Sequence, residues 1–291
     1  MLRRRLDEGG DFVPMFCNTG KERDETLDYL HEMETRWNVP LIWLEYTRVP
    51  ATPAIALTYP HSRSQKTVLE QVANREKTHW FKVVSYETAR RRDDSSTPFD
   101  ELLSWANVLP NLRNRMCSVQ MKVRTMMRFL FSEGIYAWRD HIGIRYDERD
   151  RALEIQANCP SYRTCRFPLI ESKTTEADVL SFWREQPFDL KLDTMEGNCD
   201  LCFLKKKSKR VELVRRNPDS VIWWEAQEKR FAEKKSITGD GRYFRLNEPY
   251  SLIRTLAAMP VLPFPESEDQ EIPCGCGDKG FVLSETINCE I

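Results

Sequence analysis

The stretch FVPMFCNTGKERDETLDYLHEMETRWNVPLIWLEY, residues 12–46, carries the pattern that decides the fold. An apolar strand starts at Phe12, a polar turn and an amphipathic helix follow it, and a second apolar strand starts at Leu41. One face of the helix is apolar and consists of Leu27, Leu30, Met33 and Trp37. The unit has the length of a parallel βαβ crossover. The pattern therefore predicts an α/β protein with a Rossmann-like parallel sheet flanked by helices.

The turn CNTGKE lies where the first strand ends, which is the edge at which open parallel sheets bind their ligands. Asn18, Thr19 and Gly20 would offer polar side chains and backbone groups to such a ligand. The alternative is an ordinary helix start, in which Thr19 caps the helix and Glu22 completes a capping box. Taken alone, the turn favours this alternative.

The composition is that of a globular protein. Of the 291 residues, 41% are hydrophobic and 31% are charged, and the net charge is -1. Such a balance draws the molecule neither to nucleic acid nor to an anionic membrane as a whole, so any nucleic-acid contact must be a local patch. No apolar run approaches the roughly 18 residues that a membrane span needs. We therefore expect a cytoplasmic protein with no membrane partner.

The rest of the chain divides by pattern into three regions. Residues 1–170 continue the α/β pattern, with a strand at HWFKVVSY, helices on both sides of Pro110 and a further strand at DHIGIRYDE. Residues 171–262 are mostly helical and contain a C-x-x-C pair. Residues 263–291 form a proline-rich, acidic tail with a C-x-C pair.

The cysteines predict a metal or iron–sulfur site. Cys199 and Cys202 are spaced to hold one metal or cluster, but two ligands do not fill a tetrahedral zinc site or anchor a cubane. Further candidates are Cys117 at a helix start and the tail pair Cys274 and Cys276. A dithiol redox motif or a chance pair stays open as an alternative.

Four cysteines lack such partners, and we interpret them as structural: Cys17, Cys159, Cys165 and Cys289. After the C-x-x-C pair, cations crowd residues 205–210. Their simplest interpretation is a solvated helix face. The alternative is a phosphate contact, which would confer no sequence specificity on a nucleic-acid partner.

The segments NTGKERDET, WLEY, VSYETA, RMCSVQMKVR, HIGIRYDE, PFDL and GNCDLCFLKK together resemble the phosphoadenosine phosphosulfate (PAPS) reductase family over nearly the whole chain. That family belongs to the PP-loop adenine-nucleotide alpha-hydrolase-like superfamily. The resemblance implies an adenylated ligand, ATP or PAPS, above the strand ends. Asn18, Thr19 and Gly20 would then lie beside the nucleotide, and Arg145 would face its sulfate or phosphate end.

The resemblance also implies a four-iron four-sulfur (4Fe-4S) cluster. In the cluster-containing reductases a Cys-Cys pair and a later CxxC bind it, and Cys117 with Cys199 and Cys202 resembles that layout. Met116 stands where the first cysteine of the pair would be, so one iron site stays open or Cys274 or Cys276 fills it. Zinc is the rival metal.

Two further family motifs are not matched. The terminal Glu-Cys-Gly-Leu-His motif of the reductases has only a loose counterpart in CGCGD. The Ser-Gly-Gly phosphate loop should precede Phe12, where MLRRRLDEGG is too short for a strand, loop and helix. We expect either an internal start, so that region 1–170 is N-terminally incomplete, or the loss of the phosphate cradle.

The resemblance implies an enzyme of sulfur metabolism that reduces a sulfonucleotide or uses ATP for sulfur transfer. The candidate catalytic residues are Cys117, Lys122, Arg124 and Arg145, the cations stabilising sulfonate oxygens. The expected partners are an adenine nucleotide and a thiol reductant such as thioredoxin. The alternatives are a DNA- or RNA-modifying PP-loop protein and a non-catalytic module with a structural zinc.

Overall fold

The βαβ unit predicted from residues 12–46 is present. The computed structural model describes residues 12–48, 80–159, 162–193, 195–234, 239–260 and 282–286. Strand β1 (Val13–Asn18) is followed by helix α2 (Asp24–Trp37) and strand β2 (Ile42–Thr47). The two strands are parallel, with Met15 opposite Ile42. The predicted crossover is therefore confirmed.

The sheet is mixed rather than wholly parallel. Its order is β3-β2-β1-β6-β4-β5, where the further strands are β3 (Trp80–Val84), β4 (Trp138–Ile142), β5 (Arg163–Arg166) and β6 (Val282–Thr286). Strands β4 and β5 are parallel, whereas β3 runs antiparallel to β2, and β6 runs antiparallel to both β1 and β4. The α/β class is thus confirmed, and the expectation of a parallel sheet fails for β3 and β6. An antiparallel edge strand such as β3 is common on an otherwise parallel sheet.

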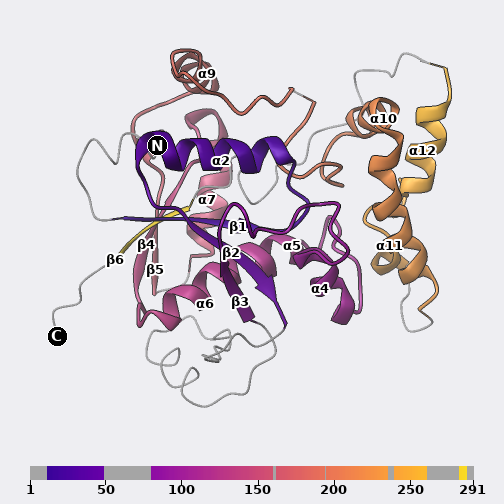
Figure 1. Cartoon of the computed structure of the whole chain (residues 1–291), viewed down its shortest axis with the longest axis horizontal. Coiled ribbons are helices and arrows are strands. Elements are labelled where there is room, and N and C mark those ends of the chain that lie inside the picture. Colours follow the sequence, from indigo (N-terminus) through magenta and orange to yellow (C-terminus); the bar gives the residue numbers. More distant parts are fainter. Residues whose placement is uncertain are drawn as a thin grey trace.

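Helices cover both faces of the sheet (Figure 1). Successive residues of a strand point to opposite faces. Phe16 and Trp43 pack with α2 on one face, while Met15 and Leu44 pack on the other with helix α6 (Arg124–Ser132). This burial on both faces explains why β1 and β2 carry apolar side chains on both of their faces.

The other helices are α4 (Pro98–Trp105), α5 (Met116–Ser118), α7 (Arg149–Ala157), α8 (Pro168–Glu171), α9 (Glu176–Arg184), α10 (Lys207–Arg216), α11 (Ile222–Ala232) and α12 (Tyr250–Ala258). A π-helical turn, Val119–Val123, joins α5 to α6, and short 3-10 turns occupy Tyr146–Glu148, Pro218–Val221 and Gly239–Arg242. No helix in the described ranges is both long enough and apolar enough to cross a membrane.

Helices α10 to α12 lie together at one side of the sheet-containing part (Figure 1). Their core is shared with that part, because Tyr46 of β2, Phe99 of α4 and Met121 belong to the same buried cluster as Trp224 and Tyr250. The shared core positions the C-x-x-C segment, which precedes α10, against the carboxyl end of β1.

Candidate functional site

The turn after β1 is built on Asn18 and Gly20. The Asn18 amide donates to the Glu45 carboxylate at 2.7 Å and to the Arg90 carbonyl at 2.8 Å, and its oxygen accepts from the Gly20 N–H at 3.0 Å. Gly20 has φ +71°, and a Cβ there would lie 2.5 Å from the Thr97 Cβ. The turn therefore requires glycine both for its backbone conformation and for space.

The capping interpretation of Thr19 is wrong. Helix α2 begins at Asp24, and its N-cap, Arg23, makes no side-chain cap hydrogen bond. Thr19 instead donates its hydroxyl and its N–H to the Glu22 carboxylate, at 2.6 and 2.8 Å. The polar residues thus fold on themselves as a compact turn before the helix.

The C-x-x-C segment is hydrogen-bonded directly to this turn. Glu22 and Cys199 form an isolated antiparallel bridge. The Arg23 N–H donates to the Asn198 carbonyl at 2.8 Å, and the Asp200 N–H donates to the Lys21 carbonyl at 2.9 Å. Two segments far apart in the sequence therefore meet at the carboxyl end of β1.

The two thiols of this segment form a pair. A hydrogen bond with the Cys202 thiol, followed by burial, raises the pKa of Cys199 well above its ordinary value. The Cys199 thiol is therefore protonated at neutral pH unless a cation binds the pair, since metal binding displaces thiol protons. The adjacent sulfurs suit two ligands of one metal ion or cluster.

Cys117 packs against the same helical core as Cys199 and Cys202. Across the ranges that the structure describes, however, no three His, Cys, Asp or Glu side chains are grouped so that they could hold a metal ion. Cys274 and Cys276 lie outside the described residues, as does Cys289. The described chain thus supplies a two-thiol half-site with a third thiol on the same core.

Lys21 is a buried cation that the sequence analysis overlooked. Its ammonium lies 4.1 Å from the centre of the Trp223 ring and donates to the Arg92 carbonyl at 3.1 Å. Burial lowers the pKa of Lys21 and raises that of nearby Asp200, while the opposite charge of each partner counters the shift. The sequence places Lys21 at the turn, directly after the Asn-Thr-Gly motif, but its burial depends on Trp223 and Asp200, which lie far away in the sequence.

The predicted cations are only partly brought together. The Lys122 ammonium, in the π-helical turn, lies 3.5 Å from the Glu22 carboxylate and so adjoins the turn after β1. Arg124 begins α6. Arg145 makes ion pairs with Asp147, Glu148 and Glu176, at 3.3, 3.4 and 3.5 Å. Arg145 therefore meets carboxylates, and an anionic ligand there would have to displace them.

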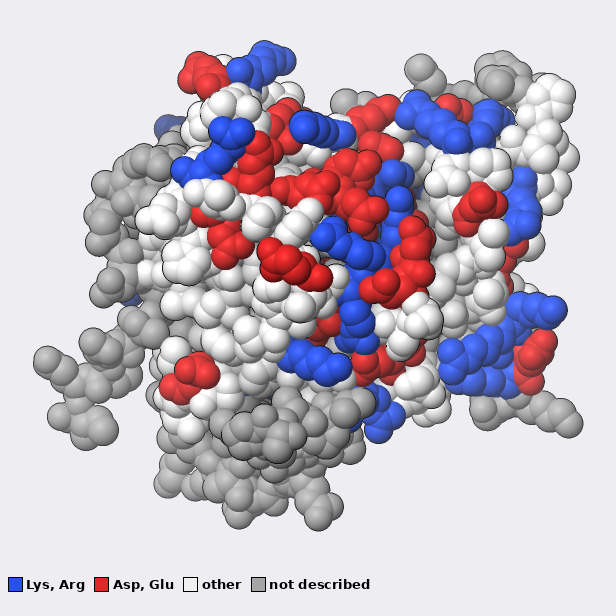
Figure 2. All heavy atoms as spheres, in the orientation of Figure 1, with Lys and Arg blue, Asp and Glu red and all other residues white. Residues whose placement is uncertain are grey.

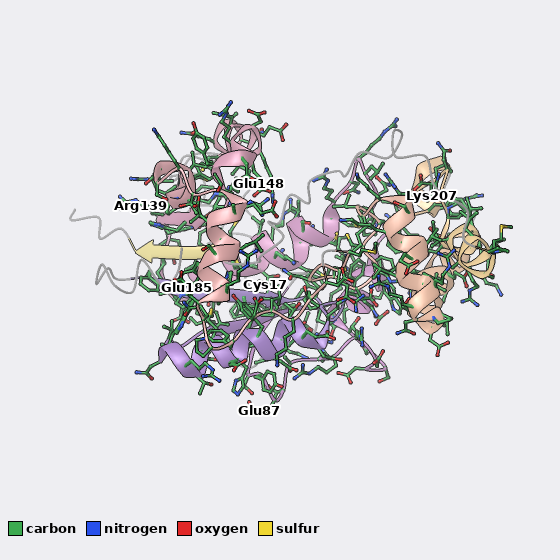
Figure 3. The ribbon with its side chains drawn as sticks, turned by 90° about the horizontal axis from the view of Figure 1, so that it is seen from above. Cys17, Glu87, Arg139, Glu148, Glu185 and Lys207 are labelled. Atoms are coloured by element: carbon green, nitrogen blue, oxygen red, sulfur yellow. The ribbon has the colours of Figure 1, made fainter. Side chains whose placement is uncertain are left out.

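The solvated-face interpretation of residues 205–210 is wrong for Arg210. Its side chain is fully buried and pairs with Glu248. Lys205 donates to the Cys199 carbonyl at 2.7 Å and so supports the C-x-x-C segment. Lys207 lies among the C-terminal helices, far from Cys17 in the interior of the sheet-containing part (Figure 3).

Cys17 is buried in the sheet, which agrees with its interpretation as a structural residue. It lies in β1 with 2% of its surface exposed, and burial raises the pKa of its thiol above the ordinary range.

These features define an α/β protein in which a thiol pair is tied to the turn after the first strand. No protein-family model matches the chain, and no solved structure matches it. Among curated proteins it is similar to the "Uncharacterized nin region protein ORF290" of Escherichia phage lambda, with 22% identity over 225 residues. The alignment covers 76% of this chain and 66% of that protein, which is just under two thirds of the relative's length.

Proposed function

We propose that this protein is an adenine-nucleotide-dependent enzyme of sulfur metabolism, with an adenine-nucleotide alpha-hydrolase-like fold and a PAPS-reductase-like site. The observation that supports the proposal most is the backbone pairing of residues 21–23 with residues 198–200. It brings a thiol pair to the strand edge at which α/β sheets bind nucleotides. The reaction is either reduction of a sulfonucleotide or ATP-dependent sulfur transfer.

In this proposal the backbone of the turn forms the surface on which the ligand lies, and a cationic side chain supplies the positive charge for its anionic group. The N–H groups of Thr19 and Gly20 are already bonded to Glu22 and Asn18. Lys122, which pairs with Glu22, is the candidate cation for a sulfonate or phosphate oxygen at this edge, and the ligand would share it with that carboxylate. Arg145 would contribute only if the ligand replaced its carboxylate partners.

Cys199 and Cys202 would hold the metal group, with Cys117 as the candidate third ligand. An iron–sulfur cluster there would supply electrons or sulfur for the reaction, whereas zinc would hold the two segments together. The role of the chain itself is to keep the two thiols adjacent and partly shielded from water.

The test is anaerobic purification of the full chain, followed by iron, zinc and acid-labile sulfide analysis and by calorimetry with ATP, PAPS and GTP. We expect iron with matching sulfide, and binding of the adenine nucleotides in preference to GTP. A chain that holds neither metal nor adenine nucleotide would contradict the proposal.

Matched variants locate the metal. We expect the double variant Cys199→Ser/Cys202→Ser to lose the bound metal, because each serine replaces a thiolate ligand. Cys17→Ser is the control, since its thiol is buried in β1, and its metal content should equal that of the wild type. Equal metal in the double variant would place the metal elsewhere.

A non-catalytic zinc module is the second candidate. The observation that favours it is the packing of Cys199 and Cys202 against the core of the C-terminal helices, where a structural metal would stabilise the fold. Zinc without sulfide, together with a large loss of thermal stability on chelation and no nucleotide binding, would favour this candidate.

A nucleic-acid-modifying enzyme has weaker support. On the face shown in Figure 2, basic side chains over the C-terminal helices gather in separate groups rather than in one continuous stripe. A continuous basic patch or stripe is the usual electrostatic footprint of a nucleic-acid-binding surface. Tight, salt-dependent binding of DNA or RNA oligonucleotides would favour it over the leading proposal.

A further inference from the structure

A second pair of thiols lies outside the candidate site. Cys159 follows helix α7, and Cys165 lies on β5, at one edge of the sheet. Their sulfur atoms are 2.8 Å apart, and the Cys159 thiol also contacts the Arg163 carbonyl at 3.2 Å. The end of α7 and strand β5 therefore keep the two sulfur atoms adjacent in the folded chain.

The two thiols differ in access. Cys165 is 8% exposed, and burial raises its pKa to about 12, whereas Cys159 is partly exposed. Arg163 hydrogen-bonds Cys159, and its guanidinium forms an ion pair with Asp140 at 3.2 Å. Cys159 is thus the member of the pair that a dissolved disulfide can reach.

The pair belongs to its own part of the core. Cys165 is buried with Ile144, Ala152 and Phe167, and Cys159 packs against the same small cluster. The C-x-x-C thiols pack against the core of the C-terminal helices instead. The chemistry of this second pair is therefore independent of the proposed function.

We propose that Cys159 and Cys165 are a reversible redox site, which forms an intramolecular disulfide by exchange with a low-molecular-weight disulfide. The Cys159 thiolate attacks one sulfur of glutathione disulfide, forms a mixed disulfide and releases one glutathione. The Cys165 thiolate then attacks the Cys159 sulfur and releases the second glutathione. The protein dithiol loses two electrons and two protons, and one glutathione disulfide becomes two molecules of glutathione.

The native contact should make ring closure favourable. In the unfolded chain the two thiols meet only by random motion of a short loop, with an effective concentration of about millimolar. In the folded chain they are already adjacent, so the equilibrium constant for disulfide formation should be at least about tenfold larger than in urea.

The experiment uses the full chain, reduced and then equilibrated with graded ratios of glutathione to glutathione disulfide, natively and in urea. Acid quenching and alkylation are followed by digestion with trypsin. Because Arg163 lies between the two cysteines, trypsin places them on separate peptides, 152–163 and 164–166. A disulfide-linked pair of these peptides is therefore diagnostic.

We expect the linked peptides to form in the wild type and in Cys199→Ser/Cys202→Ser, and to be absent from Cys159→Ser. The variant Cys165→Ala, which keeps a small apolar side chain in the cluster, should stop at the mixed disulfide on Cys159. The proposal is overturned if the folded wild type forms no linked peptides at any ratio, or if native and urea-unfolded chains give the same equilibrium constant.

Discussion

At the scale of single residues, Gly20 is the position in the turn after β1 where a larger side chain is least tolerated. Both Gly20 (φ +71°) and Gly134 (φ +76°) have left-handed backbone, but only Gly20 is crowded, by the Thr97 and Pro98 side chains. We expect Gly134→Ala to lower the free energy of unfolding by about 1 kcal/mol through the backbone alone. Gly20→Ala should cost about 3 kcal/mol or more, because steric overlap is added.

Urea unfolding of the two variants measures this difference. Equal losses for Gly20→Ala and Gly134→Ala would mean that the Thr97 and Pro98 side chains move aside freely.

Glu228 should make stability depend on pH. Its carboxylate accepts the N–H groups of Phe244 at 3.3 Å and Tyr250 at 2.8 Å, yet burial raises its pKa from 4.5 to about 7. The folded state then holds this proton more tightly than the unfolded state. The resulting stabilisation, about 3 kcal/mol, is fully present below pH 4.5 and is lost as the pH rises through 7.

The measurement is the free energy of unfolding of the wild type and of Glu228→Gln between pH 4 and 8. The difference in the free energy of unfolding between the wild type and Glu228→Gln should change by a few kcal/mol between pH 4 and 8. Glu32→Gln, on helix α2, is the control, because Glu32 forms an exposed ion pair with Arg36 at 2.8 Å and is not among the groups that shift the pKa of Glu228. A constant difference between wild type and Glu228→Gln would contradict the assignment.

The residues that build the turn could be predicted from the sequence, but the burial of the side chain that follows them could not. Asn18 and Gly20 were recognisable, because asparagine and glycine directly after a strand are typical of a tight turn. The inward position of Lys21 was not, since its burial depends on Trp223 and Asp200, which only the folded chain brings near. For the same reason, the burial of Arg210 against Glu248 could not be read from a run of cations.

At the scale of elements, Arg90 connects the ends of three segments. Its guanidinium pairs with Glu45 of β2 at 2.6 Å and with Glu101 of α4 at 2.5 Å, while its carbonyl accepts from Asn18 of β1. Glu45 is 1% exposed, so Arg90→Met would leave a buried carboxylate without its cation. We expect a loss of about 3–5 kcal/mol in the free energy of unfolding.

Arg36→Met is the matched control for this experiment. Arg36 pairs with Glu32 at 2.8 Å on the exposed face of α2, where such a pair contributes about 0.5 kcal/mol or less. Similar losses for the two variants would show that the Arg90 network is no more than a surface ion pair.

A helix or strand could be predicted where the residues that determine it lie close together in the sequence. The βαβ unit followed from residues 12–46 alone, because apolar periodicity, helix length and strand length are all encoded within that stretch. Strand β6 did not, since residues 282–286 become a strand by pairing with β1 and β4, whose sequences lie far away. The direction of β3 was likewise set by its partner β2.

At the scale of the whole molecule, one core joins the two largest regions inferred from the sequence. Phe99 of α4 contacts Trp223 and Trp224 of α11, with ring centres 5.2 and 6.2 Å apart. The division after residue 170 is therefore crossed by buried aromatic contacts. We expect a single cooperative unfolding transition in calorimetry rather than two.

Phe99→Ala tests this coupling. It should lower the free energy of unfolding by about 3–5 kcal/mol and shift the transition as one. The shift should be the same when unfolding is followed by far-ultraviolet circular dichroism and by tryptophan fluorescence. Two separated transitions, of which only one moves, would show that the C-terminal helices unfold independently.

The hydrogen bonds between residues 21–23 and 198–200 have a thermodynamic consequence for the proposed ligands. A ligand that shifts the turn must also shift the thiol segment, so the two sites share one coupling free energy. Reciprocity follows: whatever factor a metal adds to nucleotide affinity, the nucleotide adds to metal affinity. Titrating either ligand in the presence of the other would measure the same quantity.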